Sequence, residues 1–350
     1  MRSTFYGLEI ARKGLFVSQK ALDVTGGYTR QRLVTKAIPA SAMTGLYRTS
    51  EKGQVGGGVD IQSLDQIRDN FLDMQYRKET CYLGEWSSKN SAFQYVEDIF
   101  AISSDPKADP SINAALADLF DSIQEMSKNP ESKEIRTLVR QDAIKVTESL
   151  HHYYDQLVQL QREQNTAVDL SVKEINDIVI QIGDLNSQIF KFEIAGEKAN
   201  DLRDQRNMLV NNLSSMINVN YYESSDGRFR IDICGMPLVD HVNVNLLETR
   251  ADKLNSVSDD KFSTVYWKDS DIKVPISGGE IKGYIDMRDG DTADNMGIPY
   301  FVSKLNDFTR ALVAEFNNTH GQGYTLPHDG NPSTNGISFF DPDKITAKDI

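Results

Sequence analysis

The fold is decided by residues 150–192, which read LHHYYDQLVQLQREQNTAVDLSVKEINDIVIQIGDLNSQIFKF. This stretch follows Pro130 without another proline, has no glycine before Gly183, and is rich in good helix formers. Positions spaced four and three residues apart repeat every seven residues, the spacing of a helix packed through one seam. The seam positions are Leu150, Tyr154, Leu157, Gln161, Gln164, Val168, Ser171, Ile175, Ile178, Ile182, Leu185, Ile189 and Phe192. The pattern predicts one very long helix or two.

Helical patterns also occur on both sides of this stretch. We expect further helices at about residues 4–24, 63–103, 110–128, 200–213 and 298–318. The first of these helices has Leu8, Leu15 and Leu22 on a narrow apolar stripe, which covers too little area to hold a helix alone. We therefore expect it to pack against another helix, in the same molecule or in a neighbour. Leu8, Leu15 and Leu22 are candidates for an assembly interface.

The composition changes near Ile217, where strand patterns begin. Residues 218–234 predict a hairpin, because apolar and polar residues alternate on both sides of a Ser-Asp-Gly turn. Further strand candidates lie at about residues 237–247, 262–268 and 272–287. The helical pattern then returns at Ile298, so this segment is predicted to be an antiparallel β domain inserted between helices of one bundle.

The region from Gly26 to Gly58 is punctuated by glycine, which predicts loops and short strands. Within it, Gly56–Gly58 is not followed by the Lys-Ser/Thr pair of a phosphate-binding loop. We interpret these glycines as a turn.

These patterns together predict an α+β multidomain protein, with a long-helix bundle or coiled-coil rod and an inserted antiparallel β domain. The expected divisions are an N-terminal core helix with the GYTRQ segment (1–35), a glycine-rich β/loop connector (36–60), a helical rod domain (61–215), the inserted β domain (216–296), a helix returning to the rod domain (297–320), and the loop-rich, truncated start of a further segment (321–350).

The composition and net charge of the chain limit the kinds of molecule that it is expected to bind. The chain has 350 residues, 39% of them apolar and 25% charged, which is typical of a globular protein with more than one domain. Its formal net charge of -13 disfavours nucleic acid and anionic membranes as partners, since both attract basic surfaces. Neutral or basic proteins fit this charge better.

The cysteines and the N-terminus bear on localisation. Cys81 and Cys234 are far apart in segments of different character, so we expect neither a disulfide framework nor a thiolate metal site. Glu9, Arg12 and Lys13 interrupt the apolar core that a secretory signal would need, and we expect no cleaved signal peptide. Taken alone, these features indicate the cytoplasm.

The residues that could form catalytic or metal-binding groups have simpler structural interpretations. The charged residues Asp201, Arg203, Asp204 and Arg206 predict neighbouring ion pairs on a solvated helix face. Adjacent histidines, such as the pair at 151–152, point about 100° apart on a helix, which suits joint ligation of one metal poorly.

His320 and His328 flank a glycine-rich loop and do not define a metal site on their own. Neither GxSxG nor HExxH occurs, and Cys81 has no identifiable histidine partner. We predict a protein that is not an enzyme, with no cofactor-binding and no metal-binding residues.

Several blocks of the chain carry a family resemblance. The N-terminal block GLEIARKGLFVSQKALDVTG resembles the N-terminal helix of flagellar rod, hook and hook-associated proteins, and GYTRQ resembles an element of the hook-associated protein 1 family. Later blocks resemble that family in the expected order. They are QVGGGVDIQSLDQIRDNFLDMQYR, NDLRDQRNMLVNNLS, GGEIKGYIDMRDG and YFVSKLNDFTRALVAEFNNTHGQGY.

The chain departs from the family pattern in two places. Thr25-Gly26 runs directly into Gly27-Tyr28, where the family usually carries an Asn-Ile-Ala-Asn-type stretch, and nothing matches the family's C-terminal helices. By resemblance, Tyr28, Thr29, Arg30 and Gln31 form an interface or hinge.

The resemblance implies a structural adaptor at the junction between the flagellar hook and filament, required for filament assembly. It also implies export through the flagellar type III apparatus without a cleaved signal peptide, hence an extracellular location despite cytoplasmic features. The implied partners are the hook protein, the second hook-filament junction protein, further copies of the chain, and an export chaperone. Neither nucleic acid nor membrane is expected.

Two other hypotheses remain open. One is a surface-exposed binding module or adhesin presented by the β domain. The other is a related flagellar protein, either flagellin or the second junction protein, against which GYTRQ and NDLRDQR argue.

Overall fold

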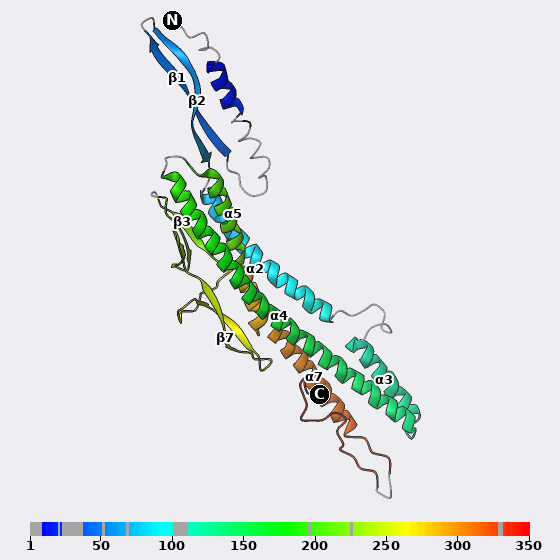
Figure 1. Cartoon of the computed structure of the whole chain (residues 1–350). Coiled ribbons are helices and arrows are strands. Elements are labelled where there is room, and N and C mark those ends of the chain that lie inside the picture. Colours follow the sequence, from blue (N-terminus) through cyan, green and yellow to red (C-terminus); the bar gives the residue numbers. More distant parts are fainter. Residues whose placement is uncertain are drawn as a thin grey trace. The chain divides into compact units, whose positions relative to one another are not determined.

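The computed structural model describes residues 9–19, 22, 38–50, 53–67, 70–100, 111–194, 198–224, 227–327 and 332–350, with residues 38–50 and 53–67 described through their backbone (Figure 1). Its helices, after a helical segment at residues 9–19, are α2 (Asn70–Phe100), α3 (Ile112–Lys128), α4 (Lys133–Glu193), α5 (Asn200–Met216), α6 (Glu280–Asp289) and α7 (Ile298–His320). Its strands are β1 (Ile38–Ser50), β2 (Gly53–Ile67), β3 (Asn220–Glu223), β4 (Phe229–Ile233), β5 (Met236–Asp240), β6 (Asn243–Val244), β7 (Leu247–Leu254) and β8 (Lys261–Trp267).

Helix α4 is one uninterrupted helix of 61 residues, about 90 Å long at the usual rise per residue. The predicted seam lies on its buried side. Of the seam residues, Leu185 is half-buried and Phe192 is exposed, and all the others are buried. The stretch therefore forms a single long helix, because its seven-residue repeat finds packing partners along nearly its whole length.

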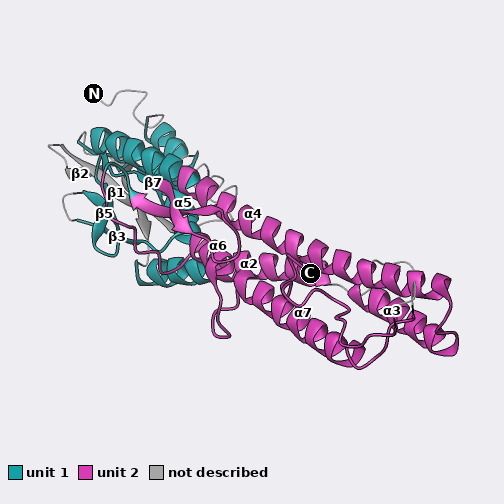
Figure 2. Ribbon diagram, turned by 90° about the horizontal axis from the view of Figure 1, so that it is seen from below, with its two compact units in different colours: residues 1–82, 174–247, 267–269 teal, residues 83–173, 248–266, 270–350 magenta. Residues whose placement is uncertain are grey.

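The chain divides into two compact units (Figure 2). Unit 1 comprises Met1–Tyr82, Glu174–Leu247 and Trp267–Asp269, and unit 2 comprises Leu83–Lys173, Glu248–Tyr266 and Ser270–Ile350. Helices α2 and α4 each contribute residues to both units. The domain boundaries drawn from the sequence remain a prediction.

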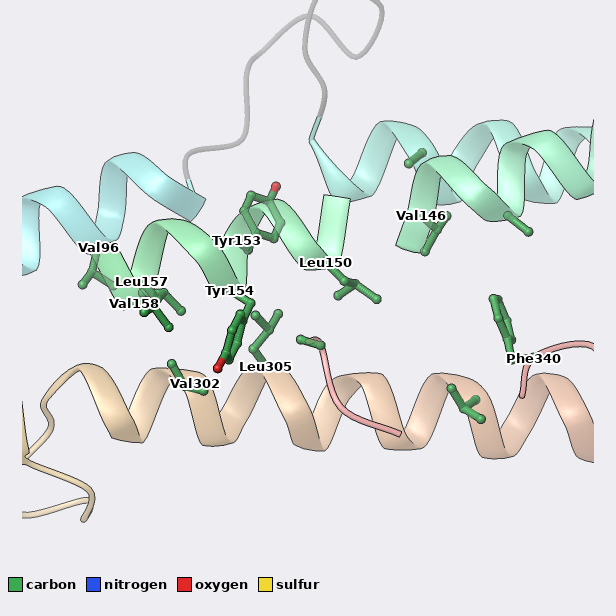
Figure 3. Packing of buried hydrophobic residues seen from close by; sticks show 14 of the residues in the cluster. Val96, Val146, Leu150, Tyr153, Tyr154, Leu157, Val158, Val302, Leu305 and Phe340 are labelled. Atoms are coloured by element: carbon green, nitrogen blue, oxygen red, sulfur yellow. The ribbon is translucent and has the colours of Figure 1, made fainter. Parts of the chain in front are cut away.

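The apolar core of unit 2 is built on α4. Leu150, Tyr154 and Leu157 are buried between side chains of other helices, including Val96 of α2 and Leu305 of α7 (Figure 3). Each aliphatic side chain that is fully buried in this way stabilises the fold by about 1.5–3 kcal/mol. Phe340 and Ala347 extend the core into the segment that follows α7.

Two asparagine side chains of α7 hold the segment that follows this helix in place through hydrogen bonds. Asn317 Oδ1 accepts hydrogen bonds from the backbone N–H groups of Phe339 and Phe340, at 2.8 Å each. Asn306 Oδ1 accepts one from the N–H of Ala347, also at 2.8 Å. These bonds satisfy backbone donors that would otherwise be costly to bury.

The strands that follow α5 form two small antiparallel sheets. One has four strands in the order β3-β4-β5-β6, and the other is the β7-β8 pair. Cys234 and Gly235 both have positive φ, 48° and 88°, and connect β4 to β5 through a two-residue turn of the kind that matches strand twist. The predicted hairpin at residues 218–234 corresponds to β3 and β4.

The interpretation of Gly56–Gly58 as a turn is wrong, because all three residues lie inside β2. Strand β1 pairs with β2 from Ser50↔Gly53 to Ile38↔Ile67, with a register shift between Gly45 and Tyr47, which face Val59 and Gly56. Glycine suits such an irregularity, since it tolerates the bent backbone of a bulge. Because β2 extends to Ile67, the following helix begins at Asn70 rather than near Ser63.

The strand predicted at residues 272–287 is also wrong in its second half, which forms helix α6. Gly279 has a φ of 85°, which ends the extended backbone, and α6 then buries Ile281, Gly283 and Met287. Ser88 of α2 lies so close to Gly283 that a side chain there would collide with it. Tertiary packing of a small residue, rather than local alternation, therefore decides this segment.

Replacing Gly283 with alanine should destabilise the protein by about 1–3 kcal/mol, because an added Cβ would lie 1.9 Å from Ser88 Oγ and 2.6 Å from the Glu85 carbonyl oxygen. Urea denaturation followed by circular dichroism measures the loss. Gly14→Ala is the control, since nothing lies within 4 Å of its Cβ position and alanine favours helix. Equal stability of the Gly283 variant and the wild type would contradict this packing.

Candidate functional site

The predicted assembly residues are only partly described. Leu15 and Leu22 are each 71% exposed, and Val17 on the same helical segment is buried. Leu8 and Tyr28–Gln31 lie outside the described residues. The assignment of Leu8, Leu15 and Leu22 to an interface remains a prediction.

Metal binding and membrane insertion each need features that the described residues lack. Within the described ranges, no cluster of three or more His, Cys, Asp or Glu side chains has the arrangement that would hold a metal ion. Across the same part of the chain, no helix combines the length and apolar character needed to span a bilayer.

The most heavily buried charged side chains are two arginines, Arg206 and Arg288, each 2% exposed. Each lies at a point where helices and strands of one unit meet. Burying a guanidinium is costly unless carboxylates and carbonyl groups surround it. The surroundings of these arginines therefore define the sites on which the arrangement of each unit depends.

In unit 1, Arg206 of α5 joins three elements. Its Nη1 donates to Asn186 Oδ1 of α4 at 3.0 Å, and its Nη2 donates to Glu223 Oε2 of β3 at 2.9 Å. The guanidinium also stacks over the ring of Phe229 in β4, 3.9 Å from its centre. Burial lowers the pKa of Arg206 to about 10, so the group keeps its charge at neutral and acid pH.

A second arginine completes this cluster. Arg203 donates from Nε and Nη2 to the two carboxylate oxygens of Glu193, at 2.6 and 2.8 Å, and from Nη1 to Glu223 Oε1 at 2.8 Å. Glu223 thus bridges both arginines. The hydrogen bonds that Arg203 donates to Glu193 lower the pKa of Glu193, in spite of partial burial, and raise the pKa of Arg203.

The solvated helix face predicted for Arg203 and Arg206 is therefore wrong for Arg206. Its partners come from α4 and β3, the elements before and after α5 in the chain, and not from α5 itself. Local spacing on one helix could not reveal them, because they are brought together by the fold of unit 1.

In unit 2, Arg288 of α6 has a fuller set of partners. Its Nε and Nη2 donate to the carboxylate of Asp289 at 2.9 and 2.7 Å. Its Nη1 donates to Asn165 Oδ1 of α4 and to the carbonyl oxygen of Ser263 in β8, at 2.8 Å each. Burial raises the pKa of Asp289, but its bonds with Arg288 and Lys253 outweigh this and lower it overall.

Amide side chains of α4 form hydrogen bonds with the backbone of the inserted segment within each unit. In unit 1, Asn176 both donates to the carbonyl oxygen of Leu247 and accepts from its N–H, at 2.8 Å each, as a neighbouring strand would. Asn186 donates to the carbonyl oxygen of His241 at 2.7 Å. In unit 2, Gln161 donates to the carbonyl oxygen of Arg288, and Asn165 accepts from the N–H of Ser263.

Sequence reasoning missed these amide contacts. Asn165, Asn176 and Asn186 lie one residue after the seam positions Gln164, Ile175 and Leu185. Repeated amides next to an apolar seam were the available signal. They indicate that the backbone of another segment, rather than water, covers this side of the helix.

The helix seam, the inserted sheets and the two arginine sites define an α+β protein in which long helices carry small sheets fixed through polar side chains. A family model described as the helical domain of the flagellar hook-associated protein FlgK matches residues 94–340, well over half of the chain. The chain belongs to this FlgK family of flagellar hook-associated proteins. The family resemblance inferred from the sequence, and the expected helical fold with an inserted antiparallel β segment, are confirmed.

Similar proteins agree with this assignment. Flagellar hook-associated protein 1 of Bacillus subtilis is 28% identical over 357 residues, covering 93% of this chain and 69% of the relative. That of Salmonella typhimurium is 25% identical over 354 residues, covering 95% of this chain and 59% of the relative. The solved flagellar hook junction protein FlgK of Burkholderia pseudomallei superposes with a TM-score of 0.56 and 22% identity, over 71% of this chain and 44% of that one. The last comparison shows the fold.

Glu193→Gln should lower the free energy of unfolding by about 1 kcal/mol at neutral pH, because it breaks the two-oxygen pair with Arg203. The pKa of Glu193 is lower in the folded than in the unfolded protein. The stabilisation is therefore complete above about pH 4.3 and is lost as the pH falls through the folded value.

Urea denaturation at both ends of this pH range tests the expectation. Glu174→Gln, on an exposed position of the same helix, is the control and should change stability by less than about 0.5 kcal/mol. The same loss for Glu193→Gln in acid as at neutral pH would show that the carboxylate charge is not the cause.

Proposed function

We propose that this chain is a structural adaptor at the junction between the hook and the filament of the bacterial flagellum, required for filament assembly and so for motility. The observation that carries the proposal is the match of residues 94–340 to the helical domain of FlgK. The similar Burkholderia protein is a flagellar hook junction protein, which supports the same role here. The chain spans 59% of the Salmonella relative, so the role of the whole protein is inferred.

The arrangement of side chains supports a role based on packing. The largest buried residues are the arginines and the aliphatic and aromatic side chains that hold helices and sheets together. We infer that catalysis forms no part of the role. Units packed in this way suit a component that bears load between two different polymers.

We propose the following partners and location. The partners are the hook protein, the second hook-filament junction protein, further copies of the chain, and an export chaperone, with no role for nucleic acid or membrane. The protein would leave the cell through the flagellar type III apparatus without a cleaved signal peptide and act outside it. The net charge of -13 is compatible with protein partners.

Within this role, Leu8, Leu15 and Leu22 would form the interface that joins copies in the assembly, with Tyr28, Thr29, Arg30 and Gln31 as a neighbouring contact or hinge. The support is their common position on one narrow apolar stripe, on which Leu15 and Leu22 are each 71% exposed and so accessible to a neighbouring copy. The segment at 216–296 would be the inserted β domain of the adaptor.

Electron microscopy of a strain lacking this protein tests the proposed function. The adaptor role predicts hooks without filaments, and restoration of filaments by the wild-type gene. Normal filaments on the mutant hooks would overturn the role. If filaments were normal but adhesion to a surface were lost, the binding-module hypothesis would replace it.

In the same strain, Leu15→Asp and Leu22→Asp should each reduce the fraction of hooks that carry filaments at least about tenfold, because a charge at the centre of an apolar interface is poorly tolerated. Leu254→Asp is a matched control, since Leu254 is 74% exposed on β7 and has no proposed interface role. Filament numbers that are equal for all three variants would contradict the interface assignment. Circular dichroism of the purified variants verifies that they remain folded.

A further inference from the structure

Strands β1 and β2 of unit 1 form a two-stranded ribbon with two open edges. The strands pair with each other from Ser50↔Gly53 to Ile38↔Ile67, over a length of about 40 Å (Figure 1). Among the described residues, this sheet has no third strand. Each strand of an antiparallel pair turns half of its backbone N–H and C=O groups away from its partner. Another extended chain is the partner that can form hydrogen bonds along the whole of such an edge.

The edge of β2 lacks the features that usually block a further strand. A ribbon of two strands is only marginally stable in water by itself, and proteins normally protect a long edge with lysine, proline or a covering element. In β2, residues 53–59 include no charged residue and no proline, and residues 56–58 are all glycine. The absence of side chains at these glycines also lets another backbone approach closely. This edge is therefore suited to pairing.

The charged residues of the ribbon have opposite signs on its two strands. Within its bounds, β1 carries Arg48 as its single charged residue, whereas β2 carries Asp60 and Asp65 and no basic residue. Two β2 edges placed together would bring like charges close to each other, which is unfavourable. A β1 edge beside a β2 edge brings opposite charges together. Charge therefore favours pairing between unlike edges.

The direction of the copies favours the same pairing. In the proposed function, on which this inference rests, the adaptor has the hook on one side and the filament on the other, so all copies must point the same way. Two β2 edges paired antiparallel are related by a twofold axis, which turns one copy over. A β1 edge paired antiparallel with a β2 edge repeats the arrangement inside the ribbon, and every copy keeps one direction.

We propose that the edge of β2 in one copy pairs, antiparallel, with the edge of β1 in the next copy of this chain, so that the ribbons of neighbouring copies form one continuous sheet. Backbone hydrogen bonds hold the copies together, and the opposite charges of β1 and β2 favour this order. Each added copy covers one open edge of its neighbour and presents another. In a closed ring of copies, no edge of the ribbon stays open.

Disulfide trapping in flagellated cells tests the pairing. Cys81 and Cys234 are replaced by serine, and two forms of this chain are expressed together in the strain that lacks the wild-type protein. One form carries Ser63→Cys in β2, and the other carries a single cysteine at each of positions 38–50 of β1 in turn. Paired strands lie about 4.7–4.9 Å apart, within the limit of about 7 Å between Cα atoms that a disulfide allows. Oxidation should give a covalent dimer of the two forms, strongest at one β1 position.

Two controls show whether the dimer reports this pairing. Each form expressed alone should give little dimer, because the same residue in neighbouring copies lies two strand spacings away, about 9.5 Å, beyond the reach of a disulfide. Glu125→Cys, on exposed α3, replaces the β1 cysteine in the second control and should give no dimer with Ser63→Cys. Gln54→Cys, also in β2, takes the place of Ser63→Cys if that variant fails to assemble.

Arg48→Asp tests the order of the strands independently. The variant makes both strands acidic at the proposed contact, so the yield of the covalent dimer should fall about threefold. Arg140→Asp makes the same change of charge at an exposed position of α4 and should leave the yield unchanged.

Three results would overturn the pairing. They are no dimer at any β1 position in cells with normal filaments, a dimer of Ser63→Cys alone that is as abundant as the mixed dimer, or a cross-link to a different protein with none between copies. Filaments counted on the same cells keep the two proposals apart. Normal filaments in the strain without the protein would refute the adaptor role, whereas filaments that require the protein but yield no cross-link would refute the ribbon pairing alone.

Discussion

The structure depends on the burial of one seam along helix α4, whose positions repeat every seven residues. The seam residues Leu150, Leu157, Val168, Ile175 and Ile182 are each 0% exposed, which places them in the part of the molecule most completely removed from water. Each such side chain contributes about 1.5–3 kcal/mol, so the seam is among the largest favourable terms in the fold. Both compact units draw on this helix, with residues up to Lys173 in one and from Glu174 in the other. The other elements of each unit therefore pack on a part of the same helix.

Polar side chains then determine where the smaller elements attach. Apolar packing tolerates sliding and rotation, whereas Arg206 and Arg288 are satisfied only when particular oxygens are within reach. The amides Asn176 and Asn186 add bonds to strand backbone that require a defined position along α4. The blocks NDLRDQR and GGEIKGYIDMRDG each contain one of these two buried arginines. In this protein, the apolar seam supplies most of the stabilising free energy, and the polar side chains determine where the smaller elements attach.

The sequence was a good guide to long periodic elements and a poor one to packing between elements. The seam from Leu150 to Ile189, the hairpin around β3 and β4, and helix α7 all follow from spacing within a short window. Helix α6 was missed because Gly283 and its contact with Ser88 decide the conformation, although the spacing of Ile281, Ile285 and Arg288 fits a helix. Burial of Arg206 could not be predicted either, because Glu223 and Asn186 approach it only in the folded unit. The assembly residues came from a narrow leucine stripe and from family resemblance, which identify a surface without identifying what covers it.

The buried seam of α4, and not its helical propensity, holds the fold together. Val168→Asp and Leu170→Asp form a matched pair on neighbouring positions of α4, since Val168 is 0% and Leu170 is 58% exposed. Their free energies of unfolding, measured by urea denaturation at neutral pH, test the claim most directly. We predict a loss of at least about 4 kcal/mol or failure to fold for Val168→Asp, and a change of less than about 0.5 kcal/mol for Leu170→Asp. Similar stabilities for the two variants would contradict the claim.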